Sequence, residues 1–314
     1  MKRGERLIKT EIRCKTTAPM FMAGSKKNEP ELRAASIKGV MRYIWRAAQR
    51  STNLQEMKRE EGKLFGNADG DNTCVCPWRI HVYLAEPRPT PSKKQDLLPY
   101  RQGNARGGRL PTESIMPEMV FTVRIIGGKC LEQHINIVRL FVLTCMLGGF
   151  GRRSRKGMGT VAIEGITGSG EAVDTEPTIE NCCKLLNGLF DDKRYVLDQS
   201  KSIITPASSA APTPPEKYPY IERIQIFDGK KKDAPTLQEI IGRAAHNNKL
   251  KHPSDKFLGE GGRTRFASSI LISTIPAPTT TQYYCIVTQL YCTKEPTPVN
   301  RGTFLAKLQE GVTE

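Results

Sequence analysis

The sequence predicts an α+β protein whose strands and helices alternate along the chain. Residues 6–15 alternate between two faces, with Ile8, Ile12 and Cys14 on one of them, which is the pattern of a half-buried strand. Residues 37–48 and 132–147 instead place apolar side chains three and four positions apart, which is the spacing of a buried helical face. Residues 80–84 and 120–126 are short apolar runs with β-branched side chains, and they indicate two further strands.

Another strand is predicted at residues 160–166, so the first half reads strand, helix, strand, strand, helix, strand. This order is the ferredoxin-like topology, which RNA-recognition domains also adopt. In those domains aromatic side chains on the sheet stack on bases. The strand that carries their aromatic pair has no counterpart in this sequence. If this half binds RNA, we therefore expect loops and helix ends to contribute more than the sheet.

The second half contains the same kinds of element in a less regular order. Helices are predicted at residues 179–189, 237–245 and 304–308, and strands at residues 221–227, 268–273 and 283–288. We therefore expect two ferredoxin-like domains, the second degenerate, with long loop insertions. The glycine-containing stretch at residues 167–170 is a plausible boundary, which gives domains of residues 1–168 and 169–314.

Three irregular stretches are predicted as loops. Residues 60–73 are polar and contain glycine, and residues 205–219 are rich in Pro, Ala and Ser. Residues 87–117 are rich in Pro and Gly and carry several arginines. Because loops of this length are usually functional or disordered, the insertion is either an arm that orders on RNA or a neighbouring subunit, or a disordered segment. Residues 19–22 (Pro-Met-Phe-Met) either line the core or form an exposed edge.

The net charge of +16 is concentrated in two places. Residues 1–50 hold 13 Lys or Arg against four Glu, and residues 147–159 hold four cations and no carboxylate. Segregated positive charge indicates a binding surface for a polyanion, and nucleic acid is the simplest candidate. Charge alone does not distinguish an RNA-binding protein from a DNA-binding or ribosome-binding protein.

Composition argues against several other classes of protein. No apolar run approaches the roughly 18 residues that a membrane span requires, and no apolar stretch follows the basic start at Met1, as a secretory signal would require. We therefore expect a cytoplasmic protein with no membrane partner, whose nine cysteines are reduced thiols. Cys74 and Cys76 lie near His81 in the sequence but lack a second pair at zinc spacing. We predict no metal site and no cofactor.

A glycine-rich basic stretch, residues 147–159, is the most distinctive feature of the sequence. Its five glycines allow close approach to another chain. A Walker loop has four residues between its glycines, whereas five separate Gly151 from Gly157, and a dinucleotide loop follows a strand, whereas this stretch follows a helix. The interpretation that remains is a flexible cationic loop for the backbone of a polyanion, with a solvated basic turn as the alternative. The predicted RNA-binding residues are Gly151, Arg152, Arg153, Ser154, Arg155 and Lys156.

A second candidate surface lies on the first helix. Ser36 is placed as its N-cap, and a capped helix start with Lys38 in its first turn favours a bound phosphate. Lys38, Arg42 and Arg46 are spaced by four and share one face, with no acidic residue to offset them. The alternative is a solvated amphipathic face. We predict that five residues here bind RNA: Ser36, Lys38, Arg42, Trp45 and Arg46.

Together, the two motifs resemble the RAMP superfamily of CRISPR proteins. Residues 149–159 (Gly-Phe-Gly-Arg-Arg-Ser-Arg-Lys-Gly-Met-Gly) match the glycine-rich loop that marks this superfamily. Three further stretches are similar to the family of the first subunit of type III-B (Cmr) effector complexes: residues 18–22, 28–33 and 36–39. The resemblance is strong over residues 5–50 and 120–165.

This resemblance implies a subunit at the 3′ end of the crRNA in an RNA-guided complex. Such a subunit binds crRNA and target RNA, contacts other subunits of the Cmr complex and helps to capture the target. A different subunit cleaves the target in these complexes, so the resemblance argues against catalysis here. By position, it carries the RNA-binding role onto Ser36, Lys38 and Arg42 and onto residues 151–156.

The main competing hypothesis is a metal-independent endoribonuclease that processes CRISPR RNA with a histidine as general acid and base. The sequence has only four histidines. The strongest candidate is His134, but the residues from His134 to Gly148 span about 20 Å if they are helical, so this side chain should lie far from the basic loop. We therefore favour a non-catalytic RNA-binding subunit.

Overall fold

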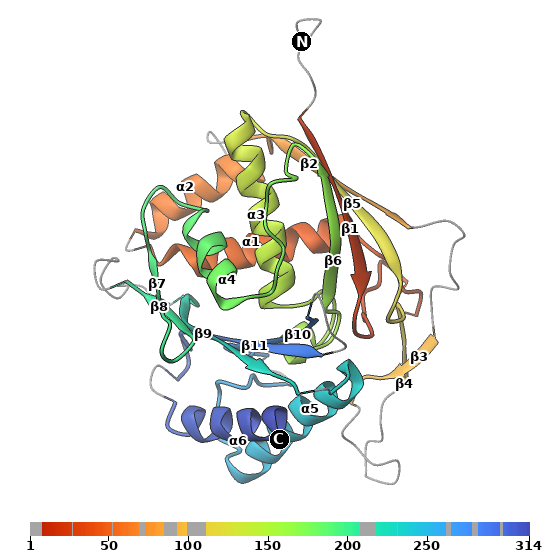
Figure 1. Cartoon of the computed structure of the whole chain (residues 1–314), viewed down its shortest axis with the longest axis vertical. Coiled ribbons are helices and arrows are strands. Elements are labelled where there is room, and N and C mark those ends of the chain that lie inside the picture. The colour runs from red at the N-terminus through yellow and green to blue at the C-terminus, as the bar shows by residue number, and fades with distance from the viewer. Residues whose placement is uncertain are drawn as a thin grey trace, which may run out of the picture.

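The computed structural model describes most of the chain (Figure 1). Its described ranges are residues 8–26, 28–51, 53–68, 73–84, 93–98, 111–207, 218–230, 232–261, 265–277, 282–295 and 298–314. Most of the predicted insertion at residues 87–117 lies outside the described residues. The same holds for residues 208–217, which form most of the predicted loop at residues 205–219.

The first sheet has four strands in the order β2-β5-β1-β6, and every neighbouring pair is antiparallel. Its strands are β1 (Lys9–Thr16), β2 (Trp78–Leu84), β5 (Val120–Gly127) and β6 (Val161–Gly168). Burial alternates along β1 and β5, as the sequence predicts for strands with one covered face. Ile12 and Val123 are fully buried on that face, whereas the opposite face is partly exposed.

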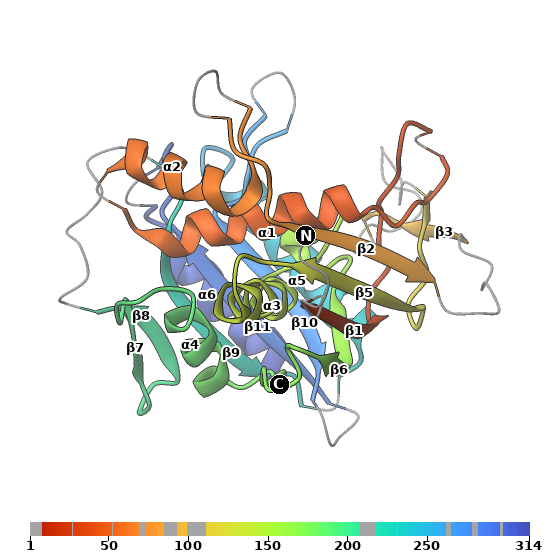
Figure 2. The ribbon, with the colours of Figure 1, turned by 90° about the horizontal axis from the view of Figure 1, so that it is seen from above.

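Helices α1 (Ala34–Gln49) and α3 (Leu131–Leu147) cover the buried face of this sheet. Helix α2 (Leu54–Phe65) packs on α1, and helix α4 (Ile179–Asn187) packs on α3. Helix α2 runs beside α1 on the outside of the molecule (Figure 2). The prediction of a loop at residues 60–73 is therefore wrong up to Phe65. This helix is capped by Asn53, whose side chain accepts hydrogen bonds from the N–H groups of Gln55 and Glu56.

The second sheet has five strands in the order β10-β11-β9-β8-β7. They are β7 (Tyr195–Asp198), β8 (Ile203–Pro206), β9 (Ile221–Asp228), β10 (Ile270–Pro276) and β11 (Tyr283–Leu290). The sequence did not predict β7 and β8, because four residues are too few to show an alternating pattern. A small separate hairpin is formed by β3 (Lys93–Asp96) and β4 (Pro111–Ser114).

The sheets and helices stack in four layers. Helix α3 contacts β6 of the first sheet and also β10 and β11 of the second, so it lies between the two sheets (Figure 1). Helices α5 (Ala234–Lys251) and α6 (Arg301–Thr313) cover the far face of the second sheet. None of the helices in the described part of the chain is both long and apolar enough to cross a membrane.

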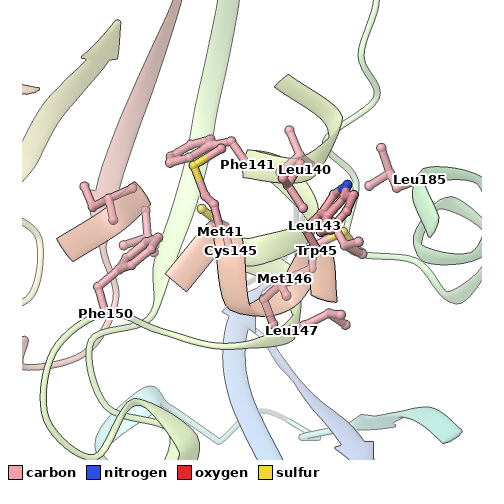
Figure 3. Packing of buried hydrophobic residues seen from close by; sticks show 14 of the residues in the cluster. Met41, Trp45, Leu140, Phe141, Leu143, Cys145, Met146, Leu147, Phe150 and Leu185 are labelled. Carbon is pink, nitrogen blue, oxygen red and sulfur yellow. The ribbon is translucent and has the colours of Figure 1, made fainter. Parts of the chain in front are cut away.

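The hydrophobic core consists of two clusters on opposite faces of the second sheet. The larger cluster contains Phe121 of β5, Phe141 of α3 and Ile286 of β11, so it includes residues from both halves of the chain. Figure 3 shows part of it, with Phe141 of α3 and Leu185 of α4. The smaller cluster, with Leu237 and Phe304, lies between the second sheet and its outer helices. Because the larger cluster includes residues on both sides of position 168, the two halves share a core.

The prediction of a mixed α and β protein with antiparallel sheets is confirmed. The open question about residues 19–22 is also answered, since Met20, Phe21 and Met22 are buried and therefore line the core.

We predict that Phe141→Ala lowers the free energy of unfolding by about 3–5 kcal/mol, because Phe141 is fully buried in the shared core and its loss leaves a cavity. Leu131→Ala is the matched control on the same helix. Leu131 is 52% exposed, so its replacement should change the free energy of unfolding by less than about 0.5 kcal/mol. Urea denaturation followed by circular dichroism measures both, and equal losses would contradict the burial of Phe141.

Candidate nucleic-acid interface

Backbone hydrogen bonds fix the glycine-rich stretch in place. The N–H of Phe150 donates to the carbonyl of Gly159 at 2.9 Å, which closes the stretch into a loop. The N–H of Arg152 donates to the carbonyl of Phe21 at 2.9 Å, and the N–H of Gly159 donates to the carbonyl of Pro19 at 3.0 Å. The side chain of Phe150 is fully buried in the larger core cluster (Figure 3). The expectation of a flexible loop is therefore wrong for this backbone.

The glycines of the loop are needed for contacts within this chain. Gly151 has a φ of +88°, and a Cβ there would lie 2.7 Å from the carbonyl oxygen of Phe21. Gly159 has a φ of +64°, and a Cβ there would collide with the carbonyl oxygen of Phe150. These two glycines therefore allow the loop to pack on its own chain, whereas the sequence suggested close approach to another molecule.

The loop also joins the two halves of the molecule. Its centre is a short 3₁₀ turn, η2 (Ser154–Lys156). Directly after this turn, the N–H of Gly157 donates to the carbonyl of Ile272 in β10 at 3.0 Å. The guanidinium of Arg155 donates to the carbonyl of Ser268, and Nζ of Lys156 lies 3.4 Å from the hydroxyl oxygen of the same serine. The basic residues are therefore held against the second half.

A cationic groove of about 400 Å³ opens beside this turn. It is lined by residues 153–156 of the loop and by residues 258–261, Phe266 and Ser268 of the second half. Among its described lining residues the only carboxylate is Glu260, which already forms ion pairs with Lys256 at 2.8 Å and Lys294 at 3.9 Å. The groove therefore has an excess of positive charge on the side of the loop.

Aromatic rings help to position two of the loop cations. The guanidinium of Arg155 lies 4.5 Å from the ring centroid of Tyr43 in α1. Nζ of Lys156 lies 6.0 Å from the ring centroid of Phe304 in α6. Arg152, in contrast, is exposed. Arg152 is therefore a solvated cation, whereas Arg155 and Lys156 are held between the two halves.

Lys156 is the cation whose protonation depends most on its surroundings. Burial lowers the pKa of Lys156 to about 7, and the charges of Arg153 and Arg155 act in the same direction. Near neutral pH its amine is therefore only partly protonated. A phosphate in the groove would favour the charged form and raise this pKa, so anion binding here is expected to be linked to proton uptake.

The first helix and the loop meet in a second pocket, of about 300 Å³. Ser36 lines this pocket from α1, and Ser154 and Arg155 line it from the loop. The structure therefore brings Ser36 close to the loop. The prediction that Ser36 is the N-cap is wrong, because two alanines before it extend the helix and α1 begins at Ala34. The residue at the N-cap, Arg33, makes no capping hydrogen bond with its side chain.

The basic face of α1 points towards α2 and away from the pocket that α1 shares with the loop. The carboxylate of Glu61 in α2 forms ion pairs with Arg42 and with Arg46, the second at 2.6 Å. The side chain of Glu61 is only 7% exposed. The statement that no acidic residue offsets these cations is therefore wrong, and it followed from the incorrect assignment of residues 60–73 as a loop.

Lys38 and Trp45 also have partners inside the protein. Nζ of Lys38 lies 2.9 Å from Sγ of Cys76 and 4.7 Å from the ring centroid of Trp78. Trp45 is 6% exposed, and its ring packs edge-on against Phe65 with 6.2 Å between the centroids. Figure 3 shows Trp45 among the side chains of the core. It therefore contributes to packing and offers no free face on which a base could stack.

The histidine considered for nuclease chemistry is buried. His134 is fully buried, with Nε2 at 2.7 Å from the hydroxyl oxygen of Thr10 and Nδ1 at 2.5 Å from the carbonyl oxygen of Gly127. Burial lowers its pKa, so it is neutral at physiological pH. Within the described ranges, no three His, Cys, Asp or Glu side chains are arranged to hold a metal ion.

Sequence reasoning missed three residues that contact the loop at the candidate interface: Tyr43, Ser268 and Phe304. Tyr43 could have been found, because it lies seven positions after Ser36 and so two turns further along the same face of α1. Ser268 and Phe304 come from the second half of the chain. No local pattern connects them with a loop more than a hundred residues earlier, so only the fold reveals their contacts.

Similar proteins are known for the first half and for the whole chain. The profile of the RAMP superfamily matches residues 13–162. The CRISPR system Cmr subunit Cmr1-2 of Pyrococcus furiosus is 40% identical over an alignment of 169 residues, which covers 46% of this chain and 90% of that protein.

Two solved structures share the fold over nearly the whole chain. The crystal structure of Cmr1 from Pyrococcus furiosus in its apo form has a TM-score of 0.56 at 17% identity, covering 90% of this chain and 88% of that chain. A cryo-EM structure of the type III-B Cmr-beta bound to cognate target RNA contains a chain with a TM-score of 0.63 at 11% identity, covering 98% of this chain and 100% of that chain.

We predict that Glu61→Gln lowers the free energy of unfolding by about 1–3 kcal/mol, because it removes the nearly buried carboxylate that pairs with Arg42 and Arg46. Glu60→Gln is the control on the same helix. The side chain of Glu60 is 44% exposed, so this change should cost less than about 0.5 kcal/mol. Urea denaturation compares the two, and a loss no larger than that of the control would show that the Glu61 ion pairs are not structural.

We predict a specific pH dependence for Lys156. The folded pKa is about 7, below the ordinary value of 10.5, so between these values the unfolded state binds more protons than the folded state. The stability of the wild-type protein relative to Lys156→Met should therefore rise from pH 7 to pH 9, by at most about 1.4 kcal/mol per pH unit. Urea denaturation at pH 6, 7, 8 and 9 measures this difference. A difference that stays constant over this range would contradict the lowered pKa.

Proposed function

This chain belongs to the RAMP superfamily, and on that premise we propose that it is a non-catalytic RNA-binding subunit of a type III-B CRISPR effector complex. In this role it binds crRNA and target RNA and contacts other subunits of the Cmr complex. It lies at the 3′ end of the crRNA and helps to capture target RNA in antiviral defence. This role places the protein in the cytoplasm.

One observation carries the RNA-binding part of the proposal: three cations of the fixed loop, Arg153, Arg155 and Lys156, converge on one groove. Cations bind phosphates and release the counterions of the nucleic acid, which is the main source of sequence-independent affinity. Because backbone hydrogen bonds already fix the loop, little conformational entropy is lost when a strand binds. The groove therefore suits the sugar–phosphate backbone of a single strand.

The path of the strand follows from the residues that line the two pockets. Ser154 and Arg155 line both the cationic groove and the pocket beside Ser36. A strand that crosses the η2 turn would thus touch α1 and the second half of the chain at once. Such contacts position RNA without reading its sequence, and the pairing of guide with target supplies the choice of sequence.

The contribution of α1 to RNA binding is revised accordingly. Arg42 and Arg46 already have a counterion in Glu61, so phosphate binding there would compete with an existing ion pair. We therefore assign the main contact to the loop and to Ser36. Arg42 and Arg46 are assigned to the packing of α1 on α2.

We infer that both halves are ferredoxin-like units, of residues 1–168 and 169–314. In the first, α1 follows β1 and α3 follows β5, and the sheet order β2-β5-β1-β6 is that of a βαββαβ unit. In the second, β9, α5, β10, β11 and α6 follow the same order, with the sheet order β10-β11-β9. The hairpin of β7 and β8 takes the place of the fourth strand beside β9, which accounts for the degeneracy.

The alternative, a metal-independent endoribonuclease, has less support. His134 is buried away from the groove and bonded to its neighbours. Among the described residues that line the cationic groove there is no histidine. Purified protein is therefore expected to leave labelled RNA intact, and cleavage that a histidine variant abolishes would support the nuclease.

We predict that Arg152→Ala and Arg153→Ala each weaken the binding of single-stranded RNA of any sequence. Each variant should flatten the dependence of log affinity on log salt concentration by about 0.7 per lost phosphate contact. Arg59→Ala is the matched control, because Arg59 is an exposed arginine on α2, distant from the loop in sequence and absent from the groove lining. Fluorescence anisotropy across a series of KCl concentrations measures all four proteins.

An unchanged salt slope in both loop variants would overturn the role of the loop. Arg155→Ala is unsuitable for this test, because Arg155 also bonds to Ser268 and its loss would loosen the contact between the two halves. Thermal melting of each variant shows whether the fold is intact, so a loss of affinity can be separated from a loss of structure.

A further inference from the structure

A groove lies between α5 and α6, the two helices that form the outer layer beside the second sheet (Figure 1). Its volume is about 290 Å³. The last turn of α6 lies beside the first half of α5, because a Cβ atom on Gly311 would be 3.1 Å from Cγ2 of Ile240. The start of α6 lies just beyond the end of α5, where Asn300 donates a hydrogen bond to Asp255 at 3.1 Å. The two helices therefore run antiparallel along the groove.

One stripe of each helix lines the groove. On α5 the lining positions recur every three or four residues, from Ile240 to Lys251, which corresponds to about 16 Å of helix. On α6 the lining runs from Thr303 to Gly311, which is about 12 Å of helix. The groove is therefore elongated along the helix axes.

The base of the groove is apolar. Ile240 and Ala244 line it from α5, and both are half-buried against the smaller core cluster. Phe304 lines it from α6 and is only 1% exposed. An apolar surface that stays open to solvent between two helices can bind apolar side chains of another molecule, because their transfer out of water is favourable.

The rim of the groove is positively charged. Three exposed cations line it: Arg243 and Lys251 of α5 and Lys307 of α6. Among its described lining residues there is no Asp or Glu. Arg243 pairs with Glu239 on the exposed surface of α5. Lys251 and Lys307 form no ion pair with any residue in the described part of the chain, so both can pair with carboxylates of another molecule.

We propose that this groove binds an acidic amphipathic helix of another subunit. Apolar side chains of that helix occupy the base of the groove, and Asp or Glu side chains beside them pair with the cations of the rim. Helices bind to such grooves through apolar residues spaced three, four and seven positions apart. A helix of three turns is about 16 Å long, which matches the length of the α5 wall. This inference rests on the proposed membership of a multisubunit complex.

Other occupants match the groove less well. RNA would contact only the rim, since phosphates gain nothing from an apolar base. Phe304 is the only Phe, Tyr or Trp in the described lining, and because it is buried it has no free face on which a base could stack. A second copy of this chain would bring a further net charge of +16 to a positive surface, which is unfavourable.

Site-specific crosslinking identifies the occupant. A benzophenone side chain is placed at position 247, because Asn247 is exposed and lines the groove from α5. The effector complex that contains this full chain is then irradiated, and the crosslinked peptides are sequenced by mass spectrometry. We expect a crosslink to a segment of another subunit with apolar residues at helical spacing and an excess of Asp and Glu. The same group at position 58, an exposed site on α2, is the control and should not reach that segment.

Reversal of the rim charge tests the ion pairs. The double variant Lys251→Glu, Lys307→Glu should weaken binding of the labelled full chain to the complex purified without it by roughly tenfold. The double variant Lys58→Glu, Lys129→Glu makes the same change in net charge at exposed sites outside the groove, so it should weaken binding by less than about twofold. The salt slope of RNA binding should be unchanged in the rim variant, because neither lysine lines the cationic groove beside η2.

Several results would overturn the inference. A crosslink to RNA, to a second copy of this chain or to a segment without excess acidic residues would do so, as would the absence of any protein crosslink in an assembled complex. Equal weakening by the two double variants, or a flatter RNA salt slope in the rim variant, would also contradict it. A chain that joins no complex would overturn the proposed function as well, whereas assembly without the expected crosslink overturns only the inference. Thermal melting of each variant separates loss of binding from loss of structure.

Discussion

The position of the basic loop depends on backbone hydrogen bonds to two distant segments. The bonds from Arg152 and Gly159 hold it to the chain at Pro19 and Phe21, and the bond from Gly157 holds it to β10. Backbone hydrogen bonds of this kind do not depend on the side chain unless a Cβ atom would clash with the backbone. The charged residues of the loop can therefore be substituted, whereas its glycines cannot. This framework also holds Lys156 in a buried position beside Arg153 and Arg155, and burial first and these charges second lower its pKa to about 7.

The same loop divides two environments of opposite charge. Arg153, Arg155 and Lys156 face the cationic groove, while Met158 lines a pocket whose titratable groups are mostly carboxylates. The loop therefore separates a positively charged surface from a negatively charged one.

Local sequence patterns predicted most of the helices and strands but few of the contacts between them. The alternation in β1 and the helical spacing in α3 arise from burial of one face, which leaves a period in the sequence. The ion pairs of Glu61 produce no periodic pattern in the sequence, because the carboxylate is buried by the packing of α2 on α1. The sequence predicted Ser36 as an N-cap, but the helix begins before it, and its position beside the loop appears only in the fold. The contacts of Ser268 depend on the whole fold and could not be predicted.

The cations of α1 and the cations of the loop look equivalent in the sequence. In the structure they differ, because a buried carboxylate pairs with two cations of α1. Arg42 and Arg46 already have Glu61 as a counterion, so a phosphate that binds them releases few ions from the protein–RNA system. The loop cations surround a groove whose only described carboxylate is occupied by two lysines. The number of positive charges in the sequence therefore overestimates the surface that is available to RNA. Arg42 and Arg46 are neutralised within the protein, so the groove beside the η2 turn, where three cations line a surface with one described carboxylate, is the better candidate site for a polyanion.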